Sequence, residues 1–273
     1  MYKTKIDWCE STWNPISGCL HGCEYCYARS IAKRFGGYTY AMENLHDDIY
    51  TKDERPIREL DRPLYVLRGS TFEESKYQKA PYPYDFIPTL HRYRLDDYAT
   101  KKDRNIFVCS MADLFGDWVP DSRLDEVFAA CKKAPQHNYL FLTKNPARYC
   151  KNLGGYGVPI ANNMWYGTTI TKEENAYKFN YLPSFCNSFV SIEPLLEDIK
   201  PGKCNIMFRQ VDWFIIGAET GHRKNKVMPE RKWIEDIVSE CRKYKKPVFM
   251  KSSLVPVWGK DLIQEFPDGL KKQ

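Results

Sequence analysis

The chain has 273 residues, of which 43% are hydrophobic, and a formal net charge of +6 at neutral pH. This length is enough to bury the core of one large domain. No apolar run approaches the roughly eighteen residues of a membrane-spanning helix, and residues 1–7 lack the apolar stretch of a signal peptide. We therefore expect a cytoplasmic protein without a membrane partner, and its positive charge would suit a polyanionic one.

Three cysteines near the N-terminus, Cys19, Cys23 and Cys26, follow a C-x3-C-x2-C spacing. A short apolar approach at 13–18 precedes them, and a run of helical character at 27–35 follows. Three thiolates on one tight loop can hold three irons of a [4Fe-4S] cluster, whereas clusters that only transfer electrons generally use four cysteines. The fourth iron stays open for a small chelating molecule, as a catalytic zinc keeps one position open. The spacing therefore predicts a cluster that takes part in chemistry.

A zinc site is the main alternative interpretation of the same cysteines. It would need a fourth ligand, which Cys9 or His21 could supply. Zinc sites usually combine two CxxC-like pairs separated by a longer loop, and no second pair follows here. The pattern consequently favours the iron–sulfur cluster.

The segment 37–104 differs in composition from the rest of the chain, because it is rich in tyrosine, proline, arginine and aspartate. We interpret it as an inserted subdomain or lid within a single domain formed by residues 1–273. Within it, residues 62–67 are predicted to form the second strand of the main sheet. Arginine and tyrosine alternate at 91–94, and such residues can stack on bases and bind phosphate. The same residue types also pack against one another on ordinary protein surfaces.

The remainder of the chain alternates strand-like and helical stretches. Helices are predicted at 123–133, with Asp121 and Ser122 as an N-cap, and at 230–244, where apolar residues recur at three- and four-residue steps. Repeated strand–helix units predict an α/β fold with a parallel sheet. The predicted strands are 106–110, 139–143, 164–170, 188–192, 213–217 and 247–250.

The cysteine loop resembles that of the radical S-adenosylmethionine (SAM) enzymes, with Tyr25 as the aromatic residue before the last cysteine. Its flanks, residues 13–19 and 26–29, resemble a phage-associated radical SAM family of unassigned function that is related to spore photoproduct lyase. The resemblance continues through 107–115, 191–194 and 212–221 and so covers most of the chain. It implies a full or partial TIM-like (β/α) barrel and an enzyme of the lyase or modification type.

This resemblance implies the following chemistry. SAM chelates the open iron, and one electron from the reduced cluster cleaves SAM to methionine and a 5′-deoxyadenosyl radical, which abstracts hydrogen from a substrate. It implies a reductant such as flavodoxin or ferredoxin, and a nucleobase or nucleic acid as the substrate. Two alternatives remain open: a radical SAM enzyme acting on a peptide or small metabolite, and a non-catalytic zinc or iron–sulfur binding protein.

The resemblance also implies a cofactor-binding set. Lys144 and Thr169 look like the lyase residues that contact the SAM carboxylate and ribose. Tyr25 is expected to contact adenine through its backbone, and Ser110 is expected to face the cofactor. Cys109 resembles the lyase cysteine that returns hydrogen to the product radical, although Asp113 lies one residue further from it than in the lyase pattern.

The substrate is expected at the last strands of the sheet, because ligands of parallel barrels bind at the carboxyl ends of the strands. Glu193 and Glu219 each follow an apolar strand and are the predicted catalytic carboxylates. His222 and Arg223 come shortly after Glu219, and Lys251 follows the strand at 247–250; the three would extend a ring of polar groups around the substrate.

Overall fold

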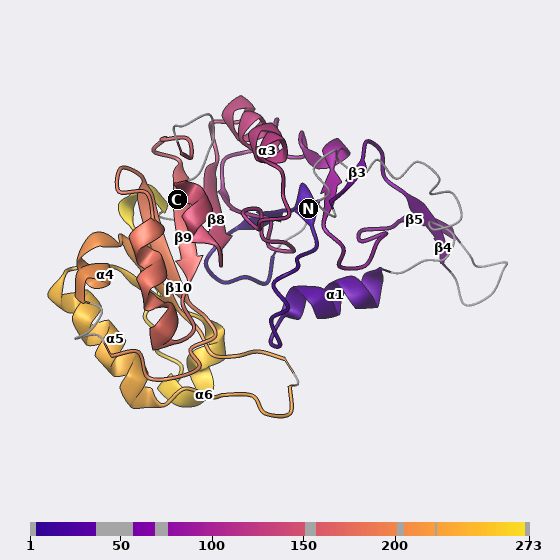
Figure 1. The fold of residues 1–273 in the computed structure, drawn as a ribbon. Helices are drawn as coiled ribbons and strands as arrows, with labels where there is room; N and C mark the ends of the chain where they lie inside the picture. Colours follow the sequence, from indigo (N-terminus) through magenta and orange to yellow (C-terminus); the bar gives the residue numbers. More distant parts are fainter. Residues whose placement is uncertain are drawn as a thin grey trace. The chain divides into compact units, whose positions relative to one another are not determined.

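A computed structural model describes residues 4–36, 57–68, 76–150, 157–200, 205–221 and 223–270. The chain divides into two compact units, which are described separately (Figure 1). We call Met1–Thr12, Lys102–Phe107 and Pro135–Gln273 the sheet unit, and Trp13–Lys101 and Val108–Ala134 the loop unit. In the described ranges, no helix has both the length and the apolar character needed to span a membrane.

The sheet unit is built on a seven-stranded sheet with the order β1-β7-β8-β9-β10-β11-β12. Every neighbouring pair from β8 to β12 is parallel, which confirms the predicted α/β class. Because β1 and β12 stand at opposite ends of the order, the described sheet is an open half-barrel. The strands are β1 (Ser11–Trp13), β7 (Asn105–Val108), β8 (Asn138–Thr143), β9 (Met164–Thr169), β10 (Asn187–Ile192), β11 (Trp213–Ile216) and β12 (Val248–Met250).

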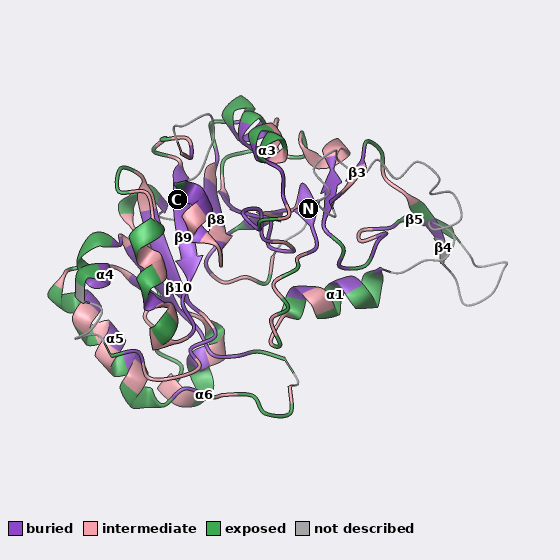
Figure 2. Ribbon diagram, viewed as in Figure 1, coloured by how far each residue is buried: buried purple, intermediate pink, exposed green. Residues whose placement is uncertain are grey.

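One face of this sheet is covered by helices. Alternate residues of the last strands, such as Val190, Phe214 and Val248, pack in one cluster with side chains of α4 (Asn205–Gln210) and α5 (Arg231–Lys243). The strands are buried while α5 turns an exposed side outward (Figure 2). The predicted helix at 230–244 is thereby confirmed, because its apolar stripe is the side that packs on the sheet.

The opposite face carries an aromatic floor. Trp213 lies at its centre, with ring centroids 6.3 Å from Trp8, 6.0 Å from Phe189 and 6.2 Å from Phe249. Cys9, whose role the sequence left open, is buried in the same cluster. On the same face, the positions nearer the carboxyl ends of these strands are mostly polar residues or glycine. A polar rim therefore borders the aromatic floor.

The loop unit holds the cysteines. Its three-stranded sheet has the order β2-β6-β3, in which β6 pairs antiparallel with β2 and parallel with β3. A separate antiparallel pair is formed by β4 and β5. The strands are β2 (Ile16–Ser17), β3 (Arg58–Leu60), β4 (Tyr65–Arg68), β5 (Lys76–Lys79) and β6 (Thr89–His91).

Two expectations from the sequence were wrong. Residues 62–67 do not form a strand of the main sheet, because β4 pairs with the fully exposed β5, whereas an inner parallel strand needs apolar side chains on both faces. The predicted helix at 123–133 is present as α3 (Asp121–Lys133), but Asp121 and Ser122 lie inside it. The N-cap position is Pro120, which has no side-chain cap, and Asp121 instead places its charge in the first turn.

The remaining helices are short. The run at 27–35 forms α1 (Tyr27–Phe35), as predicted. The others are α6 (Val255–Trp258) and the 3-10 segments η1 (Arg92–Arg94), η2 (Pro146–Tyr149), η3 (Glu173–Tyr181), η5 (Ser252–Leu254) and η6 (Asp268–Leu270).

Two arginines and three carboxylates tie the loop unit together. Arg92 bonds Glu59, Asp61 and Glu126, and Arg123 bonds Glu59 and Glu126. Burial alone would raise the pKa of Glu126, but hydrogen bonds from Arg92 and Arg123 outweigh it and hold that pKa below its ordinary value. The network joins β3, η1 and α3 through side chains that range from the shielded Glu59 to the exposed Asp61.

We predict that Gly167→Ala destabilises the sheet unit. A Cβ at position 167 would lie 2.4 Å from Cζ of Phe189, a fully buried ring. Overpacking of this kind lowers the free energy of unfolding by about 1–3 kcal/mol, measurable by chemical denaturation. The double variant Gly167→Ala/Phe189→Leu should recover part of the loss because leucine leaves room for the methyl group. Equal stability of Gly167→Ala and wild type would contradict this packing.

We also predict an acid-dependent contribution from Glu126. Because its folded-state pKa is lowered, its stabilisation is present above the unfolded pKa of about 4.3 and is lost as the pH falls through the folded value. Glu126→Gln should therefore lower the free energy of unfolding by about 1 kcal/mol at pH 6, and the difference from wild type should shrink below about pH 4. Glu235→Gln, at an exposed pair on α5, is the matched control. A difference that does not change between these pH values would refute the assignment.

Candidate functional site

The cysteine loop begins at a glycine that its surroundings require. Gly18 has φ = +85°, and a Cβ there would lie 2.3 Å from the carbonyl oxygen of Ile87. Its N–H donates to Met111 O at 2.9 Å, and the next residue, Cys19, donates its N–H to Phe86 O at 3.2 Å. Backbone hydrogen bonds therefore fix the path of the chain where the first cysteine begins.

The loop ends where α1 begins. Cys26 is the N-cap of α1, and its sulfur accepts a hydrogen bond from the N–H of Arg29 at 3.4 Å. Helix N-termini stabilise thiolates, which are the form of cysteine that binds metals. Cys26 and Cys19 both pack against a small cluster that includes Phe86 and Met111. Two of the three thiols thus share one supporting surface.

His21, in the middle of the loop, is held by a buried carboxylate. Its Nε2 lies 2.7 Å from Oδ2 of Asp113, which is 5% exposed. The other carboxylate oxygen, Oδ1, accepts the N–H of Phe115 at 3.1 Å. The ring of His21 also meets the indole of Trp118 edge-on, with centroids 5.0 Å apart. Trp118 packs closely on Gly116, where a Cβ would lie 2.2 Å from the indole.

The segment 109–113 runs along the cysteine loop. Cys109 adopts φ = +57°, and its N–H donates to Trp13 O at 2.7 Å. The hydroxyl of Tyr27 then donates to Ser110 O at 2.7 Å. Asn14 Oδ1 accepts from the N–H of Met111 at 2.9 Å and from the hydroxyl of Ser110 at 3.2 Å. The hydroxyl of Ser110, predicted to face the cofactor, therefore already donates to a protein group.

Cys109 is a buried, protonated thiol. It is 2% exposed, and burial raises its pKa to about 12. A thiol with this pKa keeps its hydrogen at neutral pH, as a hydrogen donor must. Its predicted role in returning hydrogen to a product radical stays a prediction.

The three thiols of the loop do not form a single-ion site within the described residues. All three thiols are partly exposed. Across the described part of the chain, no three His, Cys, Asp or Glu side chains are close enough to hold one metal ion. Zinc needs all its ligands about 2.3 Å or less from one centre, whereas the thiolates of a cube bind separate irons. Cys9, one proposed fourth ligand for zinc, is buried in the aromatic floor of the sheet unit.

A polar rim occupies the carboxyl edge of the sheet unit. Lys144 follows β8, Thr169 ends β9, and Glu193 and Lys251 directly follow β10 and β12. Because successive side chains of a strand point to opposite faces, these positions lie on the same face of the sheet as the aromatic floor. Parallel strands bring their carboxyl ends to one edge, so the sheet gathers the cofactor-binding and substrate-binding residues that were predicted from different strands.

Glu193 and Lys251 form an ion pair across an intervening strand. They follow β10 and β12, with β11 between them, and Lys251 Nζ bonds Glu193 Oε1. Gly217, directly after β11, makes this possible, because a Cβ there would lie 3.0 Å from Glu193 Cγ and 3.1 Å from Lys251 Cδ. The paired side chains are 21% and 16% exposed, so both remain accessible to a ligand.

Glu219 is bonded on both carboxylate oxygens. Arg223 Nε donates to Oε1 at 2.7 Å and its Nη2 donates to Oε2 at 2.8 Å, while the N–H of Val227 donates to Oε2 at 3.2 Å. These hydrogen bonds, led by that of Arg223, hold the pKa of Glu219 below its ordinary value. The carboxylate therefore braces the loop after β11, and its predicted catalytic role is not tested by this geometry. His222 lies outside the described residues.

The arginines at 91–94 bind protein groups. Arg92 is shared among the three carboxylates described above, and the guanidinium of Arg94 donates to Asn14 O, Pro81 O and the hydroxyl of Tyr93. This arrangement matches the packing interpretation of the segment rather than phosphate binding. Of the predicted lid at 37–104, residues 37–56 and 69–75 lie outside the described residues.

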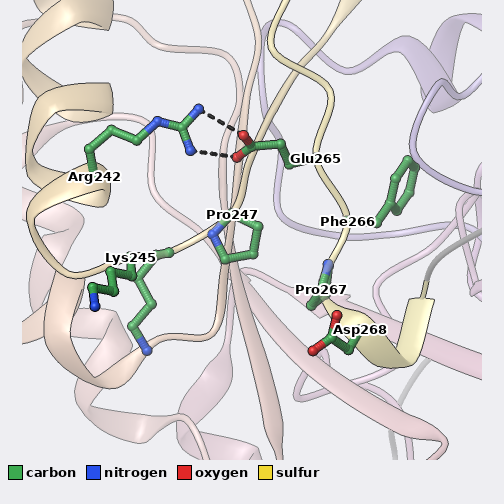
Figure 3. A pocket seen from close by; sticks show the side chains of 8 residues that line it. Arg242, Lys245, Pro247, Glu265, Phe266, Pro267 and Asp268 are labelled. Atoms are coloured by element: carbon green, nitrogen blue, oxygen red, sulfur yellow. Dashed lines mark hydrogen bonds and ion pairs between the residues drawn. The ribbon is translucent and has the colours of Figure 1, made fainter.

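A pocket of about 550 Å³ lies at the other edge of the sheet unit (Figure 3). Pro247 lines it and directly precedes β12, so it stands at the amino end of that strand. Two of its charged residues are paired, since Arg242 makes two hydrogen bonds to Glu265 at 2.7 and 2.8 Å. Glu265 also accepts the N–H of Val248 at 3.1 Å. We interpret these contacts as fastening the C-terminal segment to β12.

Sequence reasoning missed Asn14, Asp113, Trp118 and Gly217 as parts of these sites. Asp113 was noted only for its spacing from Cys109, and His21 only as a zinc ligand. Asn14 and Asp113 fall inside the quoted motifs at 13–19 and 107–115, so the two motifs could have been paired with each other. Nothing in the sequence pairs Gly217 with side chains that are distant along the chain.

Comparison with known proteins gave one structural and one family match. The structure resembles that of spore photoproduct lyase complexed with dinucleoside spore photoproduct, with 8% identity and a TM-score of 0.49, over 94% of this chain and 77% of that chain. No curated protein sequence matches the chain significantly. Residues 3–261 match the family described as "Protein of unknown function (DUF5131)". The chain therefore belongs to the DUF5131 family.

Proposed function

We propose that this protein is a radical SAM enzyme whose cysteine loop binds a [4Fe-4S] cluster through Cys19, Cys23 and Cys26. The observation that carries the proposal is the loop itself: three partly exposed thiols at C-x3-C-x2-C spacing, with the loop fixed at one end by Gly18 and at the other by the N-terminus of α1. When bound, the reduced cluster would supply the electron that cleaves SAM to methionine and a 5′-deoxyadenosyl radical. A small reductant such as flavodoxin or ferredoxin would deliver that electron.

The chain's own residues would position the cofactor and exclude competing reactions. The ammonium group of Lys144 suits the methionine carboxylate of SAM, and Thr169 offers a hydroxyl to the ribose. Tyr25, between Cys23 and Cys26, contributes backbone, and Ser110 retains acceptor lone pairs while it donates to Asn14. Tight positioning matters because a primary radical attacks whatever lies within contact distance.

On the substrate side we assign Glu193 together with Lys251. Their partly exposed pair offers one acceptor and one donor group at the rim above the aromatic floor. Glu219 would act beside them mainly by holding the loop, and Cys109 would keep a hydrogen available for transfer. A nucleobase-containing substrate is supported by the motif resemblance and the net charge of +6. A peptide or small metabolite would instead give no salt-dependent binding to nucleic acid.

The first test is the cluster. After anaerobic reconstitution with iron and sulfide, we expect the wild-type protein to bind a cluster and, with dithionite and SAM, to form 5′-deoxyadenosine. Replacing all three loop cysteines by alanine should abolish both, because each thiolate binds its own iron. Cys150→Ala, which removes an exposed cysteine outside the loop, should retain both.

Two outcomes would overturn the proposal. Bound zinc with intact SAM in the wild-type protein would establish the non-catalytic metal-binding alternative. Equal 5′-deoxyadenosine formation in the triple variant and in Cys150→Ala would show that the loop is not the site.

The second test concerns Lys144. Lys144→Met keeps much of the apolar stem and removes one charge-assisted hydrogen bond, which contributes about 1.5–3 kcal/mol. We therefore expect SAM to bind at least about tenfold more weakly to the reconstituted variant in equilibrium binding measurements. Lys172→Met removes the same charge elsewhere and should bind SAM as wild type does. Unchanged affinity in Lys144→Met would exclude Lys144 from the cofactor site.

A further inference from the structure

Three residues beside the cysteine loop remain without a role in the proposed reaction: His21, Asp113 and Trp118. All three belong to the loop unit. His21 lies between Cys19 and Cys23, while Asp113 and Trp118 lie on the segment that follows β7. We propose that they form a positioning site, which holds the cysteine loop in place and supplies a hydrogen-bond donor to the iron–sulfur group bound there.

The holding contact is a histidine–carboxylate pair. Nε2 of His21 shares one hydrogen bond with Oδ2 of Asp113, at 2.7 Å. The carboxylate cannot follow the loop if the loop moves, because its other oxygen accepts the N–H of Phe115. The side chain of Asp113 is 6% exposed and that of His21 is 23% exposed, so solvent competes weakly for the bond.

His21 stands where the loop has the most freedom. The next residue, Gly22, has φ = +70°, and a Cβ there would meet nothing within 4 Å. The backbone bonds of Gly18 and Cys19 fix the start of the loop, and α1 fixes its end. The hydrogen bond between His21 and Asp113 therefore attaches the middle of the loop, close to Cys23, to the segment that follows β7.

The donor is the indole of Trp118. Its Nε1 is buried and has no hydrogen-bond partner within the described residues. A buried N–H without an acceptor costs about 1–3 kcal/mol, so its retention beside a metal-binding loop points to an acceptor that binds there. Its ring contacts both His21 and Gly116, which limits how far it can turn away. Cluster sulfurs accept hydrogen bonds, and such bonds set reduction potentials.

The holding role can be tested without any cluster, by thiol alkylation of the metal-free protein followed by mass spectrometry. In His21→Ala and Asp113→Asn we expect Cys23 to react at least threefold faster than in wild type. Cys150 is the exposed internal reference, and Cys131 and Cys241, both fully buried, report any global unfolding. Asp103→Asn, at an exposed position, is the charge-matched control.

Wild-type alkylation rates in both variants would overturn the holding role. His21 lies on a partly exposed loop, so its replacement leaves the buried clusters intact and keeps the comparison interpretable even if Asp113→Asn unfolds.

The donor role rests on the proposed function and needs a separate measurement. Trp118→Phe keeps an aromatic ring against His21 and removes only the N–H. We expect wild-type alkylation rates, a cluster that assembles, and a midpoint potential shifted to more negative values, because a donor to sulfur stabilises the reduced cluster. An unchanged potential and an unchanged electron paramagnetic resonance spectrum would overturn this role. If wild type assembles no cluster, the proposed function and the donor role fail together, while the alkylation comparison still decides the holding role.

Discussion

The chain bends sharply directly after β7, and the arrangement around the cysteine loop depends on that bend. Cys109 takes a left-handed backbone conformation, which costs a non-glycine residue about 1–2 kcal/mol. Hydrogen bonds compensate on both sides of the bend, from Cys109 N–H to Trp13 O and from Ala112 N–H to Cys109 O. Beyond it, three groups contact the loop or its flanks: Ser110 O, Met111 O and the Asp113 carboxylate. A regular strand would have directed alternate groups away from the loop.

The two units are stabilised by different kinds of contact. The sheet unit carries an aromatic floor and a polar rim on the same face, the rim at the carboxyl ends of the strands, so the same strands specify both its core and its polar edge. The loop unit has few long elements and relies on specific polar contacts. There the guanidinium groups of Arg92, Arg94 and Arg123 are used internally, as cross-links between short segments.

Much of the sheet unit could be predicted from sequence, because period-two and period-3.6 patterns are local. The strands at 139–143, 188–192 and 213–217 and the helix at 230–244 were confirmed within about a residue or two of their bounds. The failures at 62–67 and at Asp121 concern pairing partners and capping, which depend on residues elsewhere in the chain. The same limit applies to the site. The cysteine spacing is visible in one segment, whereas the bond between His21 and Asp113 joins two residues separated by 92 positions.

The lack of a side chain at Gly217 allows Glu193 and Lys251 to pair, and this pair affects how charged ligand groups could bind at the rim. Because Glu193 and Lys251 neutralise each other across that gap, an uncharged ligand can rest above them without separating them. An anionic ligand must compete with Glu193 for Lys251, and a cationic one must compete with Lys251 for Glu193. Either exchange leaves one partly buried charge unpaired, which is costly. If the substrate binds at this ion pair as proposed, the pair would discriminate against singly charged ligand groups and accept those that are neutral or carry both charges at a matching separation.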